Sequence, residues 1–354
     1  MKIVIPGGSG QVGTILARIF TRDGHEVVVL SRTGGGNVQA GRLYHKAASA
    51  PWRVVGWDAN SLGDWVREFE GADAIINLAG RSVNCRYNSA NRTAIKASRV
   101  NSTRAVGEAI GRAQNPPRVW LQMSTATIYA HRFDAPNDEA TGIIGGQEPN
   151  APDTWNFSID VATSWERAAS DAHTPRTRKV LMRSAVVLSP DRGGIFDVLL
   201  RLVRFGLGGR AGDGRQFVSW IHEADFVRAV YHLIERESLD GPVNLASPNP
   251  VPNAEFMSVL RRAWGVRLGL PASAWMIELG AFLLRTESEL VLKSRRVVPG
   301  RLLGGGFQFH YPEWPDAARD LCEKWRARNF GLRCCGPARR APLTLTDGGG
   351  NDDK

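Results

Sequence analysis

The sequence predicts an α/β fold in which a doubly wound parallel sheet is followed by a smaller, mostly helical part. The first half of the chain alternates short, continuous apolar runs with segments of helical periodicity. Because consecutive parallel strands need crossover connections, this alternation is typical of a parallel sheet with helices on both faces. Toward the C-terminus the alternation gives way to amphipathic helices, which predict the second part.

The apolar runs of the first half are bounded by glycines and polar residues, as expected of buried strands. The opening run leads through glycines into a helix at residues 12–24, which Gly24 terminates. A further helix is predicted at residues 98–113. The strands predicted in this half are residues 2–6, 26–31, 53–57, 72–80 and 119–124.

The second half contains longer helices and one glycine-rich loop. Residues 179–190 predict a strand and residues 193–208 a helix, whereas residues 206–216 are too rich in glycine for regular structure. Residues 219–235 begin as a strand and continue as a helix. The remaining predicted elements are a strand at 242–247, helices at 254–265 and 272–285, an extended run at 306–312 and a final helix through Trp325.

The charge of the chain does not indicate a nucleic-acid partner. The net charge is +10, but the basic residues are scattered and form no block interleaved with aromatic residues, as single-strand binders have. We therefore expect a small-molecule substrate and no nucleic-acid partner. We expect the protein to be a monomer or a homodimer. The positive charge is consistent both with solvent-exposed basic faces and with phosphate binding.

Membrane and metal binding are not expected either. No apolar run approaches the roughly 20 residues needed to span a bilayer, so we expect a cytoplasmic protein, or one of an organelle matrix if a presequence has been removed. None of the four cysteines shows the spacing of a zinc site, and we expect free thiols and no metal.

A glycine-rich turn between the first strand and the first helix predicts a dinucleotide site. Gly7, Gly10 and Gly13 have G-x-x-G-x-x-G spacing. The first permits a tight turn, the second lets the backbone approach a pyrophosphate, and the third allows close packing of helix and strand. Together with Gln11 and Val12, they place the partial positive charge of the helix N-terminus at the phosphates.

The end of the second predicted strand favours NADP(H) over NAD(H). An acidic residue there would bind the ribose hydroxyls of NAD, whereas Ser31, Arg32 and Thr33 offer an arginine for the additional phosphate of NADP. Asp58 is placed to meet the adenine edge, although a turn or cap is an equal alternative. Small residues after the fourth strand are expected against the cofactor, namely Leu78, Ala79 and Gly80.

These features predict two domains and a tail. Residues 1–184 and 216–246 are expected to form a Rossmann-type domain that binds NADP(H). Residues 185–215 and 247–328 are expected to form a smaller substrate-side domain. Residues 329–354 are polar and glycine-rich, which predicts a flexible tail.

Several motifs resemble the extended short-chain dehydrogenase/reductase superfamily. They are, in order, GGSGQVG, WDA, NLAG, STATIY and WIHEADFVRAV. Residues 81–104, the SWE at 164–166 and residues 284–309 are similar to an atypical branch labelled sugar-nucleotide epimerase-like, which has a small C-terminal domain. The resemblance extends from Met1 to about Trp325 and implies an NAD(P)-dependent epimerase, dehydratase or reductase.

The proton relay that the resemblance implies is missing. Typical members use a serine or threonine and a tyrosine four residues before a lysine, whose charge lowers the tyrosine's pKa. The resemblance assigns the hydroxyl role to Thr125, beside Ser124. It puts Ser158 and Ala162 where the tyrosine and lysine would stand, and none of the five tyrosines precedes a lysine by four residues.

Other residues are candidates for the chemistry and for the ligand. If a proton is moved, the candidates are Tyr129, His222 and Asp160, although packing or hydrogen bonding alone is the more common role of such residues. Candidate substrate ligands are Arg81 and Tyr87 after the fourth strand, and Arg215 in the glycine-rich loop.

Two functions are consistent with this sequence. The first is an NADP(H)-dependent oxidoreductase or epimerase-like enzyme with an atypical active site, acting on a small polar substrate, with nucleotide-linked ones included. The second is a non-catalytic NADPH sensor or structural subunit, as an intact glycine turn beside a missing relay would predict.

Overall fold

Seven parallel strands form the main sheet of this computed structural model, which describes residues 1–32, 50–148, 151–283 and 287–330. All neighbouring strands of the main sheet run parallel, which confirms the predicted doubly wound fold. In spatial order the strands are β10 (Gly241–Leu245), β6 (Arg178–Ser184), β5 (Val119–Thr125), β4 (Ala74–Asn77), β1 (Lys2–Pro6), β2 (Glu26–Ser31) and β3 (Arg53–Gly56).

Successive residues of each central strand pack into different cores, which explains why the strands are continuous apolar runs. Ile3 and Ile5 of β1 belong to the core on one face of the sheet, whereas Val4 belongs to the core on the other. In β2, Val27 and Val29 alternate in the same way with their neighbours. Side chains that alternate between two buried faces leave no polar side to a strand.

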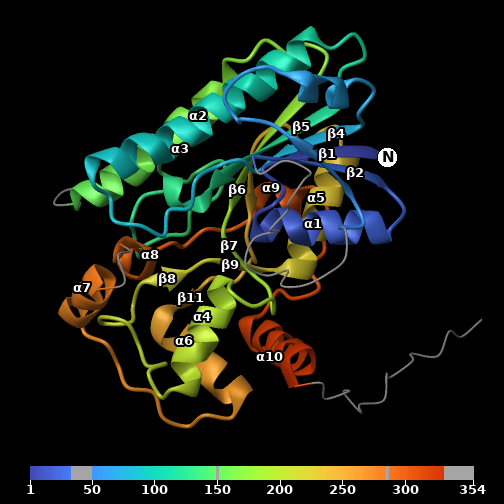
Figure 1. Cartoon of the computed structure of the whole chain (residues 1–354). Coiled ribbons are helices and arrows are strands. Elements are labelled where there is room, and N and C mark those ends of the chain that lie inside the picture. The colour runs from blue at the N-terminus through green and yellow to red at the C-terminus, as the bar shows by residue number, and fades with distance from the viewer. Residues whose placement is uncertain (33–49, 149–150, 284–286, 331–354) are drawn as a thin grey trace, which may run out of the picture.

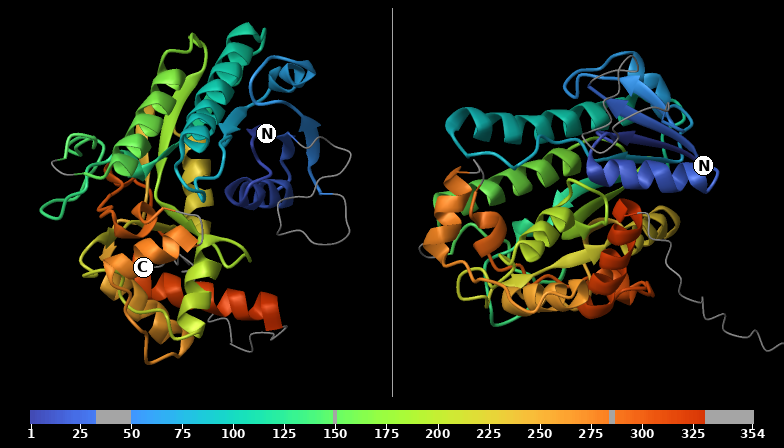
Figure 2. Two further views of the ribbon diagram at one scale, coloured as in Figure 1. Left: turned by 60° about the vertical axis from the view of Figure 1, so that its left-hand side comes forward. Right: turned by 60° about the horizontal axis from the view of Figure 1, so that its bottom comes forward.

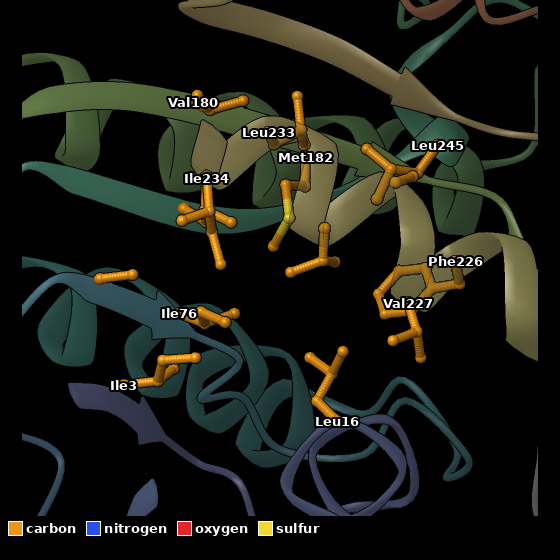
Figure 3. Packing of buried hydrophobic residues seen from close by; sticks show 14 of the residues in the cluster. Ile3, Leu16, Ile76, Val180, Met182, Phe226, Val227, Leu233, Ile234 and Leu245 are labelled. Atoms are coloured by element: carbon orange, nitrogen blue, oxygen red, sulfur yellow. The ribbon is translucent and has the colours of Figure 1, made fainter. Parts of the chain in front are cut away.

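Helices cover both faces of the sheet (Figure 1). On one face lie α1 (Gln11–Arg22) and α5 (Glu223–Glu235), and on the other α2 (Ser89–Arg112) and α3 (Asp153–Ser170). Leu16 of α1 and Phe226 of α5 point into the same core as Ile76 of β4, as Figure 3 shows. In α1 the apolar residues recur three and four positions apart, so that one side of the helix packs on the sheet.

The strand order reverses between β1 and β4, and this reversal positions the site. From β1 the chain moves outward to β2 and β3, and from β4 it moves the other way to β5, β6 and β10. The loops at the carboxyl ends of β1 and β4 therefore diverge at the switch point. In open α/β sheets, ligands bind in the crevice at this point.

A second body lies beside the main sheet and contains most of the C-terminal residues (Figure 2). Its core includes Trp220, Phe256 and Trp314, and it is separate from the two cores of the sheet. Its elements are α4 (Ile195–Arg204), β8 (Phe217–Val218), β11 (Val251–Pro252), α6 (Asn253–Trp264), α7 (Ala274–Leu283), α8 (Glu289–Leu292) and α10 (Trp314–Phe330). Short elements complete the fold: β7 (Val186–Leu188), β9 (Trp220–His222), α9 (Gly300–Gly304), and the 3-10 helices η1 (Asp64–Phe69) and η2 (Ala126–Ile128).

Two predicted elements differ in the structure. The single strand predicted at residues 179–190 is divided at Ala185, because β7 leaves the main sheet and pairs with β9. The extended run predicted at residues 306–312 lies between α9 and α10, outside any helix or strand. The final helix continues past Trp325 to Phe330, so only residues 329–330 of the predicted tail are described, and both are helical.

No helix within the described ranges is long and apolar enough to cross a membrane.

Replacing Trp314 by alanine is expected to destabilise the second body. Its ring stacks on Phe256 at a centroid distance of 4.1 Å and its Nε1 donates to the Phe256 carbonyl oxygen at 2.9 Å. Loss of a buried tryptophan typically costs about 3–5 kcal/mol. Urea unfolding followed by circular dichroism measures the change. Trp275→Ala, at a side chain that is 66% exposed, serves as the control and is expected to change stability by less than about 0.5 kcal/mol.

Candidate functional site

The glycine turn brings α1 against the end of β4. Gly7 has a φ of +75°, and a Cβ there would lie 2.6 Å from the Ala79 Cα. A Cβ on Gly13 would lie 2.4 Å from the Gly8 Cα. Since neither position tolerates a side chain, the turn can pack this closely only with glycine at both.

The N-terminus of α1 is open to an anion. Gly10 caps the helix without a side-chain hydrogen bond, and the first intrahelical bond runs from the Thr14 N–H to the Gly10 carbonyl at 2.9 Å. The backbone amides of residues 11–13 therefore have no partner within the helix. Amides in this arrangement, together with the helix dipole, suit the pyrophosphate of a dinucleotide.

A cavity of about 230 Å³, here called the glycine-turn cavity, lies next to this turn. None of the described residues that line it carries a carboxylate, and Arg32 lines it at the end of β2. The lining residues are Gly7, Ser9, Gly10, Leu30, Ser31, Arg32, Trp57, Ala59, Leu78, Ala79, Gly80, Arg81 and Ser98. The structure thus brings together most of the predicted cofactor residues, and adds Arg81, which was predicted to bind substrate.

Four of the predicted cofactor residues that the structure describes do not line this cavity, and Asp58 is the fourth of them. Gln11 lines a different cavity of about 450 Å³, Val12 packs on the core, and Gly13 lies against Gly8. Thr33 lies outside the described residues.

The fourth, Asp58, holds a turn rather than lining the cavity. Its carboxylate accepts hydrogen bonds from the backbone amides of Asn60 and Ser61, each at 2.9 Å, and from the Ser61 hydroxyl. The hydrogen bond from this hydroxyl lowers the pKa of Asp58. The turn presents Ala59, with a φ of 62°, and the neighbouring Trp57 to the cavity.

The loop after β4 is fixed by a buried asparagine. Asn77 is fully buried, and its Oδ1 accepts a hydrogen bond from the Ala79 N–H at 3.1 Å. Its Nδ2 donates to the Gln122 Oε1 at 2.9 Å. These bonds hold the small residues Ala79 and Gly80 against the glycine turn.

A second cavity, of about 130 Å³, lies at the end of β5 and is here called the Thr125 cavity. It is lined by Val83 and Tyr87 from the loop after β4, by Ile95 and Arg99 from α2, by Thr125 and Thr127, by Phe157, Ser158, Val161 and Trp165 from α3, and by Glu289 and Arg295 from the C-terminal part. Arg99 lies against Gly80, since a Cβ there would be 3.2 Å from its Cζ. The Thr125 cavity therefore adjoins the glycine-turn cavity.

The polar groups of the Thr125 cavity centre on Glu289, which is 2% exposed. The Ser158 hydroxyl donates to its Oε2 at 2.6 Å. The Lys293 Nζ lies 3.9 Å from its Oε1 and donates to the Thr127 carbonyl at 3.0 Å. Burial lowers the pKa of Lys293 to about 8.

Tyr87 and Arg99 face this cavity in a poorly solvated setting. Burial raises the pKa of Tyr87 to about 12, so the phenol stays protonated at neutral pH and can donate a hydrogen bond. Burial lowers the pKa of Arg99 to about 10, which leaves the guanidinium charged.

Ser124 and Tyr129 belong to a buried network instead of the Thr125 cavity. The Ser124 hydroxyl donates to Glu166 Oε1 at 2.6 Å, and Glu166 pairs with Arg183 at 2.8 Å. The Tyr129 hydroxyl donates to Asn244 Oδ1 and accepts from Arg183 Nη1, both at 3.0 Å. Burial raises the pKa of Tyr129. These hydroxyls have their partners within the protein.

His222 lies at the junction with the second body and lines neither cavity. Its Nδ1 accepts a hydrogen bond from the Ala224 N–H at 3.0 Å, so Nε2 carries the proton and donates to Asp320 at 2.9 Å. Although burial opposes it, hydrogen bonds from His222 and Lys324 lower the pKa of Asp320 to about 2. The His222 ring also stacks on Tyr311, and His222 is the N-cap residue of α5.

The two positions that the resemblance assigns to the tyrosine and the lysine have different surroundings. Ser158 lines the Thr125 cavity, whereas Ala162 is fully buried among Ala126, Ile128 and Tyr129. A lysine at residue 162 would have to displace this packing. Of the two positions, only the one assigned to the tyrosine, Ser158, lines a cavity.

Arg81, Asp160 and Arg215 are accounted for by other contacts. The Arg81 Nη2 donates to Asn91 Oδ1 at 2.8 Å, and Asp160 pairs with Lys96 at 2.8 Å. Arg215 is exposed, lines neither cavity, and lies 5.7 Å from the centroid of the Phe133 ring. Of the predicted substrate residues, only Tyr87 lines the Thr125 cavity.

Several residues that line the Thr125 cavity could not be identified from the sequence. Glu289 and Arg295 follow the last long amphipathic pattern and look like surface charges. Arg99 lies within a predicted helix whose charged residues indicate solvent exposure. Phe157 lies before the SWE motif at residues 164–166 and belongs to no motif of its own. Only their contacts across the fold bring them to the site. In the described part of the chain, no group of three or more metal-ligating side chains occurs.

Comparisons with known proteins agree over nearly the whole chain. Residues 3–246 match the family model described as NAD dependent epimerase/dehydratase family, and residues 272–321 match a domain of unknown function, DUF1731. The human epimerase family protein SDR39U1 is 30% identical over 324 residues, which cover 91% of this chain and 99% of the human protein. The Bacillus subtilis epimerase family protein YfhF is 28% identical over 321 residues, covering 91% of this chain and 98% of YfhF.

Solved structures of epimerase family proteins are similar to this chain over most of its length. The crystal structure of human SDR39U1 (isoform 2) with NADPH has a TM-score of 0.75 at 29% identity and covers 91% of this chain and 99% of that chain. A nucleoside-diphosphate sugar epimerase from Corynebacterium glutamicum has a TM-score of 0.66 at 26% identity, covering 93% of this chain and 59% of that one.

Replacing Tyr129 by phenylalanine is expected to lower stability by about 1–3 kcal/mol, because Asn244 and Arg183 each lose a buried hydrogen-bond partner. Chemical denaturation measures the change. Tyr231→Phe is the control, since that hydroxyl bonds to Asp23 at the surface. Equal stability of the two variants would contradict a structural role for the Tyr129 hydroxyl.

Proposed function

Since the chain belongs to the NAD dependent epimerase/dehydratase family, we propose that it is an NADP(H)-binding oxidoreductase or epimerase-like enzyme for a small polar substrate. The observation that carries this proposal is the glycine-turn cavity, where Arg32 directly follows β2 and no lining residue among those described is acidic. An arginine without a competing carboxylate suits the 2′-phosphate of NADP. The relative crystallised with NADPH supports the same cofactor.

Each part of the site has a distinct role in this proposal. When bound, NADP(H) supplies or takes the hydride. The amides of residues 11–13 hold the pyrophosphate, and Arg32 holds the additional phosphate. The substrate enters the adjoining Thr125 cavity, where the Thr125 hydroxyl orients a substrate oxygen.

The proposal also assigns the parts of the chain. Residues 1–184 and 216–246 hold the cofactor, and the smaller part, residues 185–215 and 247–328, closes the substrate side. Glu289 and Arg295, which line the Thr125 cavity, come from this smaller part. We propose a cytoplasmic or organelle-matrix protein that acts as a monomer or homodimer on a free or nucleotide-linked substrate.

A second candidate function is a dinucleotide-binding protein without turnover. The observation that favours it is the absence of the relay, with Ser158 and a fully buried Ala162 where the tyrosine and lysine would stand. Positioned acid–base groups typically contribute about 10²- to 10⁴-fold to rate, so their loss would leave slow chemistry or none.

Incubation with NADPH and a panel of carbonyl compounds and nucleotide sugars separates the two functions. The enzyme is expected to oxidise NADPH, or to convert epimers, only when substrate is present. Chromatography and absorbance at the reduced nicotinamide band follow both reactions. Tight NADPH binding with no turnover over the whole panel would favour the second function.

Arg32→Ala is expected to weaken NADPH binding by about tenfold and to leave NADH binding unchanged, because a charged hydrogen bond contributes about 1.5 kcal/mol or more. Isothermal titration calorimetry with both dinucleotides measures this difference. Arg67→Ala, at an exposed arginine that pairs with Asp64, is the charge-matched control. A preference for NADPH that survives in Arg32→Ala would remove the basis of the cofactor assignment.

A further inference from the structure

Glu289 presents a carboxylate of which only one oxygen accepts a hydrogen bond from a described residue. Its Oε2 accepts the hydrogen bond from Ser158, whereas no described residue donates a hydrogen bond to its buried Oε1. The residue is 2% exposed and lines the Thr125 cavity. Because an unsatisfied buried acceptor is costly, the free lone pairs of Oε1 point to a donor brought by a ligand.

We propose that Oε1 of Glu289 accepts a hydrogen bond from the hydroxyl group of a small hydroxy acid bound in the Thr125 cavity, whose carboxylate pairs with Arg99. This inference rests on the proposed function, because it names the class of substrate for the same site. It assigns to the C-terminal part a residue that contacts substrate.

The charges of the cavity favour an anionic ligand. Arg99, Arg295 and Glu289 are the charged residues among the described ones that line it, so these walls carry a net positive charge. The Arg99 Nη1 donates to the carbonyl oxygens of Arg81 and Ile95, and no carboxylate of a described residue forms an ion pair with Arg99. A half-buried guanidinium without a carboxylate partner suits a ligand carboxylate.

The size and the walls of the cavity favour a short carbon chain. A volume of about 130 Å³ compares with the ~150 Å³ of an engineered apolar cavity that holds benzene. Val83, Ile95, Phe157, Val161 and Trp165 supply apolar walls. Together these walls suit a ligand of a few carbon atoms with polar groups at one end.

A hydroxyl suits Glu289 better than an ammonium group does. The Lys293 Nζ and the Arg295 Nη2 lie 3.9 Å and 4.0 Å from the Oε1 of Glu289. A third cation at this oxygen would be repelled by both, whereas a neutral hydroxyl would not. The proposal therefore favours hydroxy acids over amino acids.

Tyr87, Ser158 and Glu289 lie together where the tyrosine of the absent proton relay would stand. Ser158, at the position of the absent tyrosine, donates a hydrogen bond to Glu289, and Tyr87 lines the same cavity. Tyr87, Ser158 and Glu289 thus place one donor and one unsatisfied acceptor at the wall where typical relatives place the tyrosine. Two of these three residues lie far from Ser158 in the sequence.

Binding of three matched probes tests the proposal without relying on turnover. The dissociation constants of 2-hydroxybutyrate, butyrate and 2-aminobutyrate are measured by calorimetry or ligand-observed NMR, in the presence and absence of NADP⁺. The native protein is expected to bind 2-hydroxybutyrate at least about tenfold more tightly than butyrate, which lacks the hydroxyl. A native protein that prefers butyrate or 2-aminobutyrate, or binds none of the three, would overturn the inference.

Glu289→Gln is expected to reduce the preference for 2-hydroxybutyrate over butyrate to about threefold or less. Glu287→Gln is the matched control, because this buried acid of the same segment does not line the cavity and instead bonds the Tyr87 N–H at 2.7 Å. The control is expected to keep the native preference. An unchanged preference in Glu289→Gln would refute the role of Oε1.

Arg99→Gln provides a second test that is independent of the folding of Glu289→Gln. It is expected to weaken both 2-hydroxybutyrate and butyrate by about tenfold and to leave their ratio unchanged, since both carry the carboxylate. Unaltered binding of both acids would contradict the assignment of Arg99. NADPH affinity is measured in parallel and tests the proposed function alone. If a variant or the native protein shows no preference for the hydroxy acid but still binds NADPH, only this inference is contradicted.

Discussion

The burial of both faces of the main sheet is the constraint on which the rest of this structure depends. Each central strand alternates its side chains between two apolar cores, so polar residues are concentrated toward and beyond the carboxyl ends of the strands. At the carboxyl ends of β1, β2 and β4 these residues meet and form the glycine-turn cavity. At the end of β5 they form the Thr125 cavity. The position of the site thus follows from the way in which the sheet is covered.

Much of the cofactor side could be predicted from the sequence, because its determinants are local. Continuous apolar runs and the spacing of Gly7, Gly10 and Gly13 predicted the sheet and the turn, and the family resemblance drawn from these motifs is confirmed. The turn needs glycine for steric reasons that involve only near neighbours and the end of β4. Arg32 could be identified because it directly follows a strand whose position was evident.

The substrate side depends on contacts that no local pattern contains. Tyr129 and His222 have the residue types of proton carriers, but their polar atoms bond to Asn244, Arg183 and Asp320, which lie far along the chain. Conversely, Glu289 has the surroundings of surface charge in the sequence and is buried in the fold. Residue type alone therefore does not distinguish a hydroxyl that a protein satisfies itself from an oxygen that it leaves unsatisfied.

The division of the cavity walls has an evolutionary consequence. Among the described residues, those that line the glycine-turn cavity all lie before residue 100, whereas the carboxylate that lines the Thr125 cavity comes from the short helix α8 near the end of the described chain. Substitutions in that distant segment can change the lining of the Thr125 cavity while the glycine-turn cavity stays the same. Related proteins can therefore diverge at one cavity and retain the other.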